Sequence, residues 1–282
     1  MGGEDHFFSS GGLRLHGRLY RGGAKTPAIC IPGLTRNERD FSEVGPFLAE
    51  TGRDVFAVSL RGRGLSDRDP DFMNYRPPTY VGDVLAALDS LGWRKAVFVG
   101  TSLGGLVTML TNERAGERVA GAVINDIGPE LAPEGIARIA GYVGGEAPPP
   151  AETIDDAATQ IRAINEVAFP GRDASFWRLF ATRTFRRRAD GRYVLDYDRL
   201  IGRALVEAEP VGDLWPVFKK LEGKPTLVTR GTLSDLLTPP ILQKMRAAVP
   251  DMRTVDIPNV GHAPTLSEPD AARAMTDFVG AL

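Results

Sequence analysis

The sequence predicts an α/β fold with a mostly parallel sheet, and three observations support it. After an N-terminal hairpin signal, short apolar segments rich in β-branched residues alternate with segments of helical periodicity. The alternation returns near the C-terminal end, so sheet elements flank a middle region with few strand signals. The 282 residues, 43% hydrophobic and 25% charged, have the composition of a globular protein with a large core.

The expected elements follow in chain order. Residues 5–10 and 13–20 alternate in polarity on either side of Gly11-Gly12, which indicates a hairpin. Further strands are expected at 28–31, 54–60, 96–99, 119–125, 226–229 and 253–257. Helices are expected at 41–50, 80–91, 103–114, 240–249 and 270–282. Strands separated by helices pair in parallel, which predicts βαβ units.

The middle region, residues 128–214, contains several amphipathic helical stretches and a Gly- and Pro-rich break at 144–150. We therefore expect a core formed by residues 1–127 and 215–282, and a helical cap formed by residues 128–214. The break is interpreted as a loop or hinge between cap helices.

The run Gly100-Thr101-Ser102-Leu103-Gly104 carries the main chemical signal. It lies where an apolar strand meets a helix, the position of a nucleophile elbow. A turn this tight requires residues without a Cβ two positions before and after the serine. Ser102 is therefore the predicted nucleophile.

A serine hydroxyl needs a base within hydrogen-bond reach, and histidine is the usual one. The chain has three histidines, and His6 and His16 fall in the predicted hairpin. His262 follows the strand at 253–257, and open α/β sheets place their sites at the carboxyl ends of strands. His262 is the predicted general base.

The base needs a carboxylate to orient it. Asp235 follows the strand at 226–229 and gives the order Ser, Asp, His, so we favour it. Asp126, after the strand at 119–125, is the alternative. The oxyanion needs two backbone N–H donors, for which we expect Leu103, after the nucleophile, and Leu34, after the strand at 28–31.

Composition narrows the function classes. The formal net charge of −2 argues against nucleic acid as a partner. Cys30, the single cysteine, lies in an apolar run and is interpreted as structural. No secretory signal or membrane span is visible, so a soluble cytoplasmic protein is expected. The sequence shows neither clustered His/Cys ligands nor a dinucleotide loop, so no metal or cofactor is expected.

Together, the runs at 31–34, 61–67 (Arg-Gly-Arg-Gly-Leu-Ser-Asp) and 100–105, with Asp235 and Gly261-His262, resemble the α/β-hydrolase superfamily. The resemblance spans nearly the whole chain and is strongest to capped bacterial esterases, enol-lactonases and carbon–carbon bond hydrolases. It implies an eight-stranded core with a lid after the sixth strand. Carbon–carbon bond hydrolases often have tryptophan where this chain has Ala263, which disfavours that activity.

The predicted function is a serine hydrolase that cleaves an ester or lactone of a small, partly apolar molecule through an acyl-enzyme on Ser102. Alternatives are a carbon–carbon bond hydrolase, a low-turnover ligand-binding protein and a cofactor-free perhydrolase. Trp177 and Phe180 in the cap and Asn37 after the strand at 28–31 are candidate substrate contacts, with cap packing an equal alternative for the aromatic residues. The arginines at 183–192 are interpreted as a solvated helix end rather than an anion site.

Overall fold

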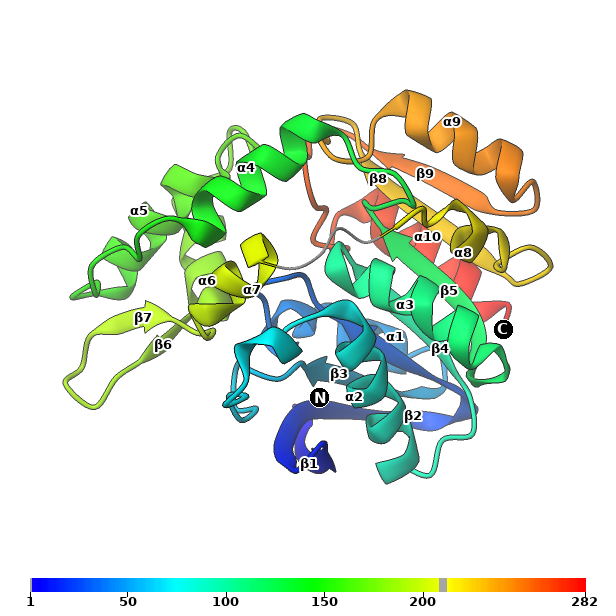
Figure 1. Cartoon of the computed structure of the whole chain (residues 1–282), viewed down its shortest axis with the longest axis horizontal. Helices are drawn as coiled ribbons and strands as arrows, with labels where there is room; N and C mark the ends of the chain where they lie inside the picture. Colours follow the sequence, from blue (N-terminus) through cyan, green and yellow to red (C-terminus); the bar gives the residue numbers. More distant parts are fainter. Residues whose placement is uncertain (1, 208–211) are drawn as a thin grey trace.

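The fold is described from a computed structural model that covers residues 2–207 and 212–282, so residues 1 and 208–211 of the predicted core and cap lie outside it. Its described residues form a main sheet of seven strands and a two-stranded hairpin (Figure 1). The main sheet contains β1 (Glu4–Ser10), β2 (Leu13–Ile31), β3 (Arg53–Ser59), β4 (Ala96–Thr101), β5 (Val119–Asn125), β8 (Thr226–Gly231) and β9 (Arg253–Ile257). Within this sheet β4, β5, β8 and β9 pair in parallel, as predicted.

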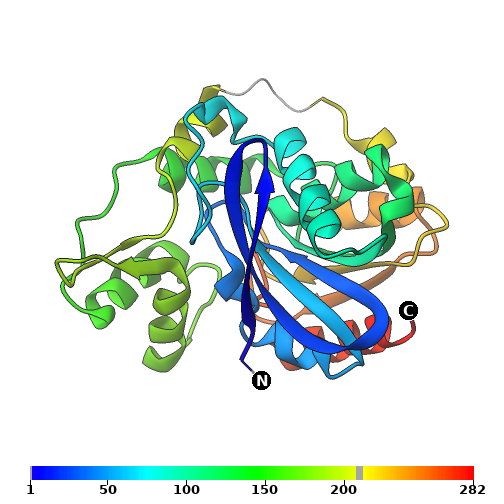
Figure 2. The same ribbon diagram turned by 90° about the horizontal axis from the view of Figure 1, so that it is seen from below.

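The expected count of eight strands is corrected to seven because β2 is continuous. Residues 13–19 of β2 pair with β1, and residues 28–31 pair in parallel with β4. Phe56 in β3 has a partner in each half of β2, Leu19 and Ile29. β3 therefore lies between the two halves of β2, which fill two positions of the sheet (Figure 2).

Helices cover both faces of the sheet (Figure 1). Their bounds are α1 (Val44–Ala49), α2 (Pro77–Ser90), α3 (Leu103–Arg114), α8 (Trp215–Lys219), α9 (Pro239–Ala248) and α10 (Pro269–Gly280), with short 3₁₀ turns at Glu38–Phe41, Phe72–Asn74 and Gly116–Arg118. Side chains that alternate along β2 divide the core: Ala28 and Cys30 pack with α1 and α10, and Ile29 and Ile31 pack with α2 and α3. Cys30 is fully buried, and burial raises the pKa of its thiol.

The chain leaves the sheet after β5 and returns to it at β8. The intervening segment contains α4 (Pro133–Gly144), α5 (Ile154–Asn165), α6 (Ala174–Thr184) and α7 (Leu200–Glu207). It also contains a hairpin of β6 (Phe185–Arg187) and β7 (Tyr193–Leu195), where we expected a helix end. These elements lie together beside the sheet (Figure 1), and residues 128–214 are called the insertion below. None of the described helices is long and apolar enough to cross a membrane.

Candidate active site

Ser102 lies in the sharp turn between β4 and α3. Its backbone has φ 52° and ψ −117°, a strained conformation for a residue with a side chain. A Cβ on Gly100 would lie 2.3 Å from the Gly104 carbonyl oxygen, and a Cβ on Gly104 would lie 2.1 Å from the Ile31 carbonyl oxygen. Both positions therefore require glycine, as the sequence pattern predicts, and the turn leaves the Ser102 side chain on the wall of a cavity.

A Gly104→Ala variant should be destabilised by about 3 kcal/mol, because the new methyl group clashes with the Ile31 carbonyl group, and backbone atoms cannot move away as the end of a side chain can. Urea denaturation measures the effect. The control is Gly82→Ala in α2, where a Cβ meets nothing within 4 Å and should add about 0.5–1 kcal/mol of stability. Equal stability of the two variants would contradict the steric explanation.

His262 reaches Ser102 from the loop after β9. Its Nε2 lies 2.8 Å from Ser102 Oγ, and its side chain is 7% exposed. Asn125 holds this loop against the sheet: its Nδ2 donates to the Pro264 carbonyl at 2.8 Å and its Oδ1 accepts from Thr229 Oγ1 at 2.7 Å. The predicted nucleophile and base are thus within hydrogen-bond distance.

Asp126 completes the hydrogen-bonded line. Its Oδ2 lies 2.8 Å from His262 Nδ1 and accepts from Ser234 Oγ at 2.7 Å, and its Oδ1 accepts from the Gly231 N–H at 2.9 Å. The side chain is fully buried, and the backbone has φ 58°, which Asp adopts more readily than most residues. These contacts fix one orientation of the carboxylate against the imidazole.

The preference for Asp235 is corrected by this geometry. Asp235 receives two hydrogen bonds from Arg138 of α4, at 2.6 and 2.8 Å, and its side chain is 32% exposed. Those bonds lower the pKa of the Asp235 carboxyl. Gly231 at the end of β8 and Ser234 in the loop after it instead hold Asp126. A signal for this was available in the sequence, because Asp126 directly follows the strand at 119–125, whose first six residues are apolar.

The two predicted oxyanion donors are backbone groups in the segments that follow β2 and β4. Neither the Leu34 N–H nor the Leu103 N–H donates a hydrogen bond to any residue that the structure describes. Leu103 is the first residue of α3, where the helix dipole favours negative charge. Leu34 lines the same cavity as Ser102.

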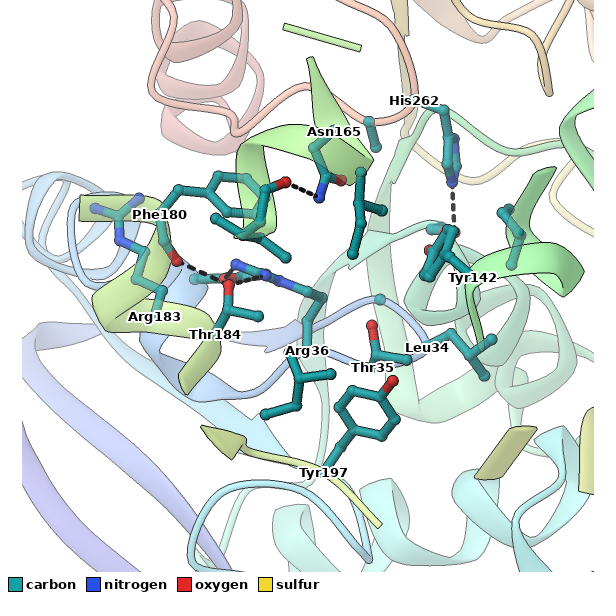
Figure 3. Close-up of a pocket in the computed structure, with 18 of the residues that line it drawn as sticks. Leu34, Thr35, Arg36, Tyr142, Asn165, Phe180, Arg183, Thr184, Tyr197 and His262 are labelled. Atoms are coloured by element: carbon teal, nitrogen blue, oxygen red, sulfur yellow. Dashed lines mark hydrogen bonds and ion pairs between the residues drawn. The ribbon is translucent and has the colours of Figure 1, made fainter. Parts of the chain in front are cut away.

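The cavity has a volume of about 590 Å³ and lies between the sheet and the insertion. Figure 3 shows His262 on one side of it, and Phe180, Arg183 and Thr184 of α6 on the other. Tyr142 of α4 also lines it, and burial raises the pKa of its hydroxyl. Apolar residues from the insertion form much of the remaining wall: Ile139, Ile161, Ile164, Phe169 and Leu195.

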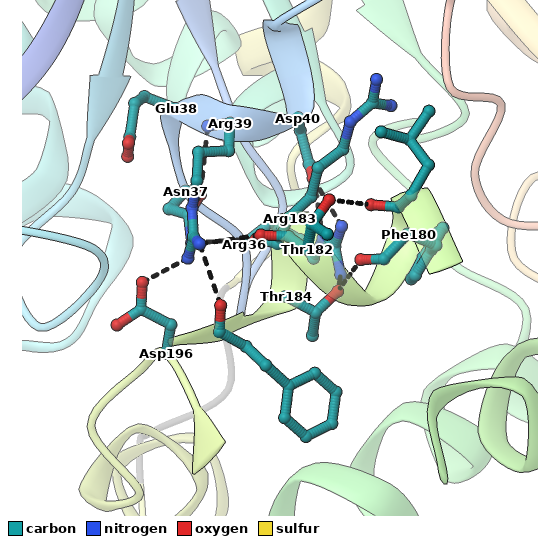
Figure 4. A network of polar contacts seen from close by, with 12 residues as sticks. Arg36, Asn37, Glu38, Arg39, Asp40, Phe180, Thr182, Arg183, Thr184 and Asp196 are labelled. Atoms are coloured by element: carbon teal, nitrogen blue, oxygen red, sulfur yellow. Dashed lines mark hydrogen bonds and ion pairs between the residues drawn. The ribbon is translucent and has the colours of Figure 1, made fainter. Parts of the chain in front are cut away.

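Of the three candidate substrate contacts, only Phe180 lines this cavity. Trp177 is 2% exposed and packs against Phe169, so it belongs to the core of the insertion. Asn37 is also buried. It caps the turn at Glu38–Phe41 and donates from Nδ2 to the Arg183 carbonyl at 3.2 Å (Figure 4). The predictions for Trp177 and Asn37 are therefore corrected: both side chains hold parts of the protein together.

Arginines of the run at 183–192 also form ion pairs with carboxylates of the protein itself. Arg183 pairs with Glu43 at 2.7 Å, Arg192 pairs with Asp190 at 2.9 Å, and Arg186 lies 3.6 Å from Asp196. Within residues 2–207 and 212–282, no group of three or more His, Cys, Asp or Glu is arranged to hold a metal ion.

Comparison of the sequence with models of protein families identifies the family of this chain. A model described as the alpha/beta hydrolase family matches residues 28–274. The chain belongs to the alpha/beta hydrolase family. The match includes β4, the turn at Ser102, β5 and the loop that carries His262. Hydrolase activity is therefore assigned at the level of the family.

Known proteins match this sequence over most of its length. The 3-hydroxybutyrate-oligomer hydrolase of Cupriavidus necator is 33% identical over 263 residues, 90% of this chain and 88% of that protein. The 2-(acetamidomethylene)succinate hydrolase of Mesorhizobium japonicum is 24% identical over 283 residues, 99% of this chain and 97% of that protein. A crystal structure of an alpha/beta hydrolase from Novosphingobium aromaticivorans is 41% identical and superimposes with a TM-score of 0.92, covering 99% of each chain.

Proposed function

We propose that the protein is a serine hydrolase that cleaves a carboxylic ester through an acyl-enzyme on Ser102. The observation that carries the proposal is the line Ser102, His262 and Asp126, with both hydrogen bonds at 2.8 Å, on the wall of the cavity. This arrangement suits proton transfer from a weak nucleophile to a base whose tautomer is fixed by a buried carboxylate.

In the proposed reaction, Ser102 Oγ attacks the ester carbonyl carbon while its proton passes to His262 Nε2. The Leu34 and Leu103 N–H groups donate to the oxyanion of the tetrahedral intermediate. The intermediate collapses, the C–O bond to the alcohol breaks, and His262 gives its proton to the departing alcohol. Water then attacks the acyl-enzyme and loses a proton to His262. The C–O bond to Ser102 Oγ breaks, His262 returns the proton to Oγ, and the acid is released.

The insertion at 128–214 acts as a cap in this proposal, since it supplies most of the apolar cavity wall. A cavity of about 590 Å³ is of the size that holds a compact organic ligand. Together with the Cupriavidus relative, this favours short aliphatic oligoesters such as those of 3-hydroxybutyrate as the first substrates to test. Lactones, which present the same carbonyl within a ring, are the second class.

A panel of substrates tests the proposal. If the substrates are short oligoesters like those named for the Cupriavidus relative, the trimer of 3-hydroxybutyrate and p-nitrophenyl butyrate should be cleaved with kcat/KM more than about tenfold above that for p-nitrophenyl palmitate. A fluorophosphonate should label Ser102, as located by mass spectrometry. Absence of both labelling and turnover would reject a serine hydrolase, and turnover of lactones alone would assign a lactonase.

A further inference from the structure

Arg63, in the run at 61–67, is buried beneath the loop that carries Leu34. The residue is 1% exposed. Its Nε and Nη2 donate to the Leu34 carbonyl oxygen at 2.9 and 2.7 Å, and its Nη1 donates to the Arg61 carbonyl at 2.6 Å and to the Tyr80 hydroxyl at 2.9 Å. The reaction proposed above gives Arg63 no role.

Burying a guanidinium is costly unless its charge is balanced. Among the residues that the structure describes, no carboxylate forms an ion pair with Arg63. Its neighbour Arg61 pairs with two, Asp69 at 2.5 Å and Asp83 at 2.6 Å, and this cluster therefore carries one excess negative charge. That excess offsets the charge of Arg63 at longer range, while all five N–H groups of Arg63 remain available to uncharged oxygen acceptors.

Arg63 fixes the peptide on one side of Leu34, and the turn fixes the peptide on the other. The Gly33 carbonyl accepts from the Arg36 N–H at 3.1 Å, and the Leu34 carbonyl accepts both bonds from Arg63. Because a peptide bond is planar and trans, the Leu34 N–H points opposite to the Gly33 carbonyl. With both carbonyls held, the direction of that N–H is fixed as well.

The insertion holds the backbone on both sides of Arg63. The Asp198 N–H donates to the Gly62 carbonyl at 2.7 Å, and the Gly64 N–H donates to the Asp196 carbonyl at 3.2 Å. Arg63 is therefore braced by the insertion at its backbone and braces the Leu34 loop with its side chain.

We infer that Arg63 is a positioning residue for the oxyanion hole, aligning the Leu34 N–H before the substrate arrives. The inference rests on the proposed function. A donor that is already aligned stabilises the oxyanion without reorganisation during the reaction. The two-pronged bond to one carbonyl oxygen requires the planar fork of arginine, which the single Nζ of lysine does not reproduce.

Arg63→Lys tests the inference because it keeps the positive charge and removes the fork. We expect kcat per active site, titrated with a fluorophosphonate, to fall about ten- to hundred-fold while KM changes less than about threefold. Affinity for a trifluoromethyl ketone, which forms a tetrahedral oxyanion on a serine, should fall by the same factor as kcat. Tyr80→Phe, which removes only one partner of Arg63, should lower kcat about two- to fivefold and serves if the lysine variant does not fold.

Arg53→Lys is the matched control. Arg53 is fully buried, donates from Nη1 to the Thr26 carbonyl at 2.9 Å, and lies at the start of β3, away from the cavity. It should lose similar stability but keep the kcat per active site of the wild type. Wild-type kcat and ketone affinity in Arg63→Lys, or equal losses in the control, would overturn the inference. A wild-type protein that neither labels nor turns over would reject the proposed function instead.

Discussion

Replacing Ser102 with Ala should lower kcat by at least 10⁴-fold, on the order found when a serine nucleophile is removed, for every ester that the wild type cleaves. The alanine side chain has no oxygen to form the acyl-enzyme, and His262 then has no proton to accept from it. Substrate binding should persist, because the cavity wall loses a single oxygen atom. Steady-state kinetics and equilibrium binding of the uncleaved substrate measure the two effects separately.

The matched control is Ser9→Ala, the same change at an exposed position in β1. It should keep the wild-type kcat and remain open to labelling by a fluorophosphonate, whereas Ser102→Ala should not be labelled. A Ser102→Ala enzyme that retains ester turnover, with the residual rate insensitive to the phosphonate, would exclude the acyl-enzyme mechanism.

Local pattern explains why the turn at Ser102 is predictable from sequence. The contact that forbids a side chain at Gly100 is made with Gly104, four residues away, so both partners lie within one short motif. His262 is predictable for another reason: the other two histidines lie in the hairpin of β1 and β2, where His16 bonds to Asp5 and His6 to Ser90. With His6 and His16 excluded, His262 is the histidine that remains, and it is the one that lies beside Ser102 in the structure.

The carboxylate depends on information that is not local. Asp126 and Asp235 each follow a parallel strand, and both give the chain order Ser, Asp, His, so chain order alone does not distinguish them. The order of strands decides between them, because β5 pairs with β4 on one side and with β8 on the other. Asp126 thus begins its loop beside β4, the strand that directly precedes Ser102, while Asp235 bonds to Arg138 on a helix of the insertion.

Tertiary packing also explains why the predictions of Trp177 and Asn37 as substrate contacts are wrong. Trp177 lies on α6, whose aromatic residues face both the cavity and the core of the insertion, and periodicity does not distinguish the two sides. Asn37 is a polar loop residue whose partner, the Arg183 carbonyl, is 146 positions away. The continuous β2 is a similar case, since β3 inserts between halves that are adjacent in sequence.

Replacing Asp126 with Asn should lower kcat by about 10⁴-fold, because the surroundings impose the wrong orientation on an amide. The Gly231 N–H is a fixed donor and will hold the amide oxygen on its side of the group. The NH₂ then faces His262 Nδ1, which must accept a hydrogen bond and leave its own proton on Nε2. In that tautomer His262 has no free lone pair to take the proton of Ser102. A plot of kcat against pH for the variant and the wild type measures the loss.

Asp235→Asn is the same substitution in the neighbouring loop, and it should change kcat by less than about threefold. The carboxylate is partly exposed and bonded to Arg138, so its loss should cost no more than about 1 kcal/mol of stability. Arg138 lowers the pKa of Asp235 in the folded state, so this stabilisation is complete above the pKa of the unfolded chain and disappears as the pH falls through the folded value. A 10⁴-fold loss at Asp235 with activity retained at Asp126 would return the role to Asp235, because only a carboxylate that contacts His262 during the reaction fixes its tautomer.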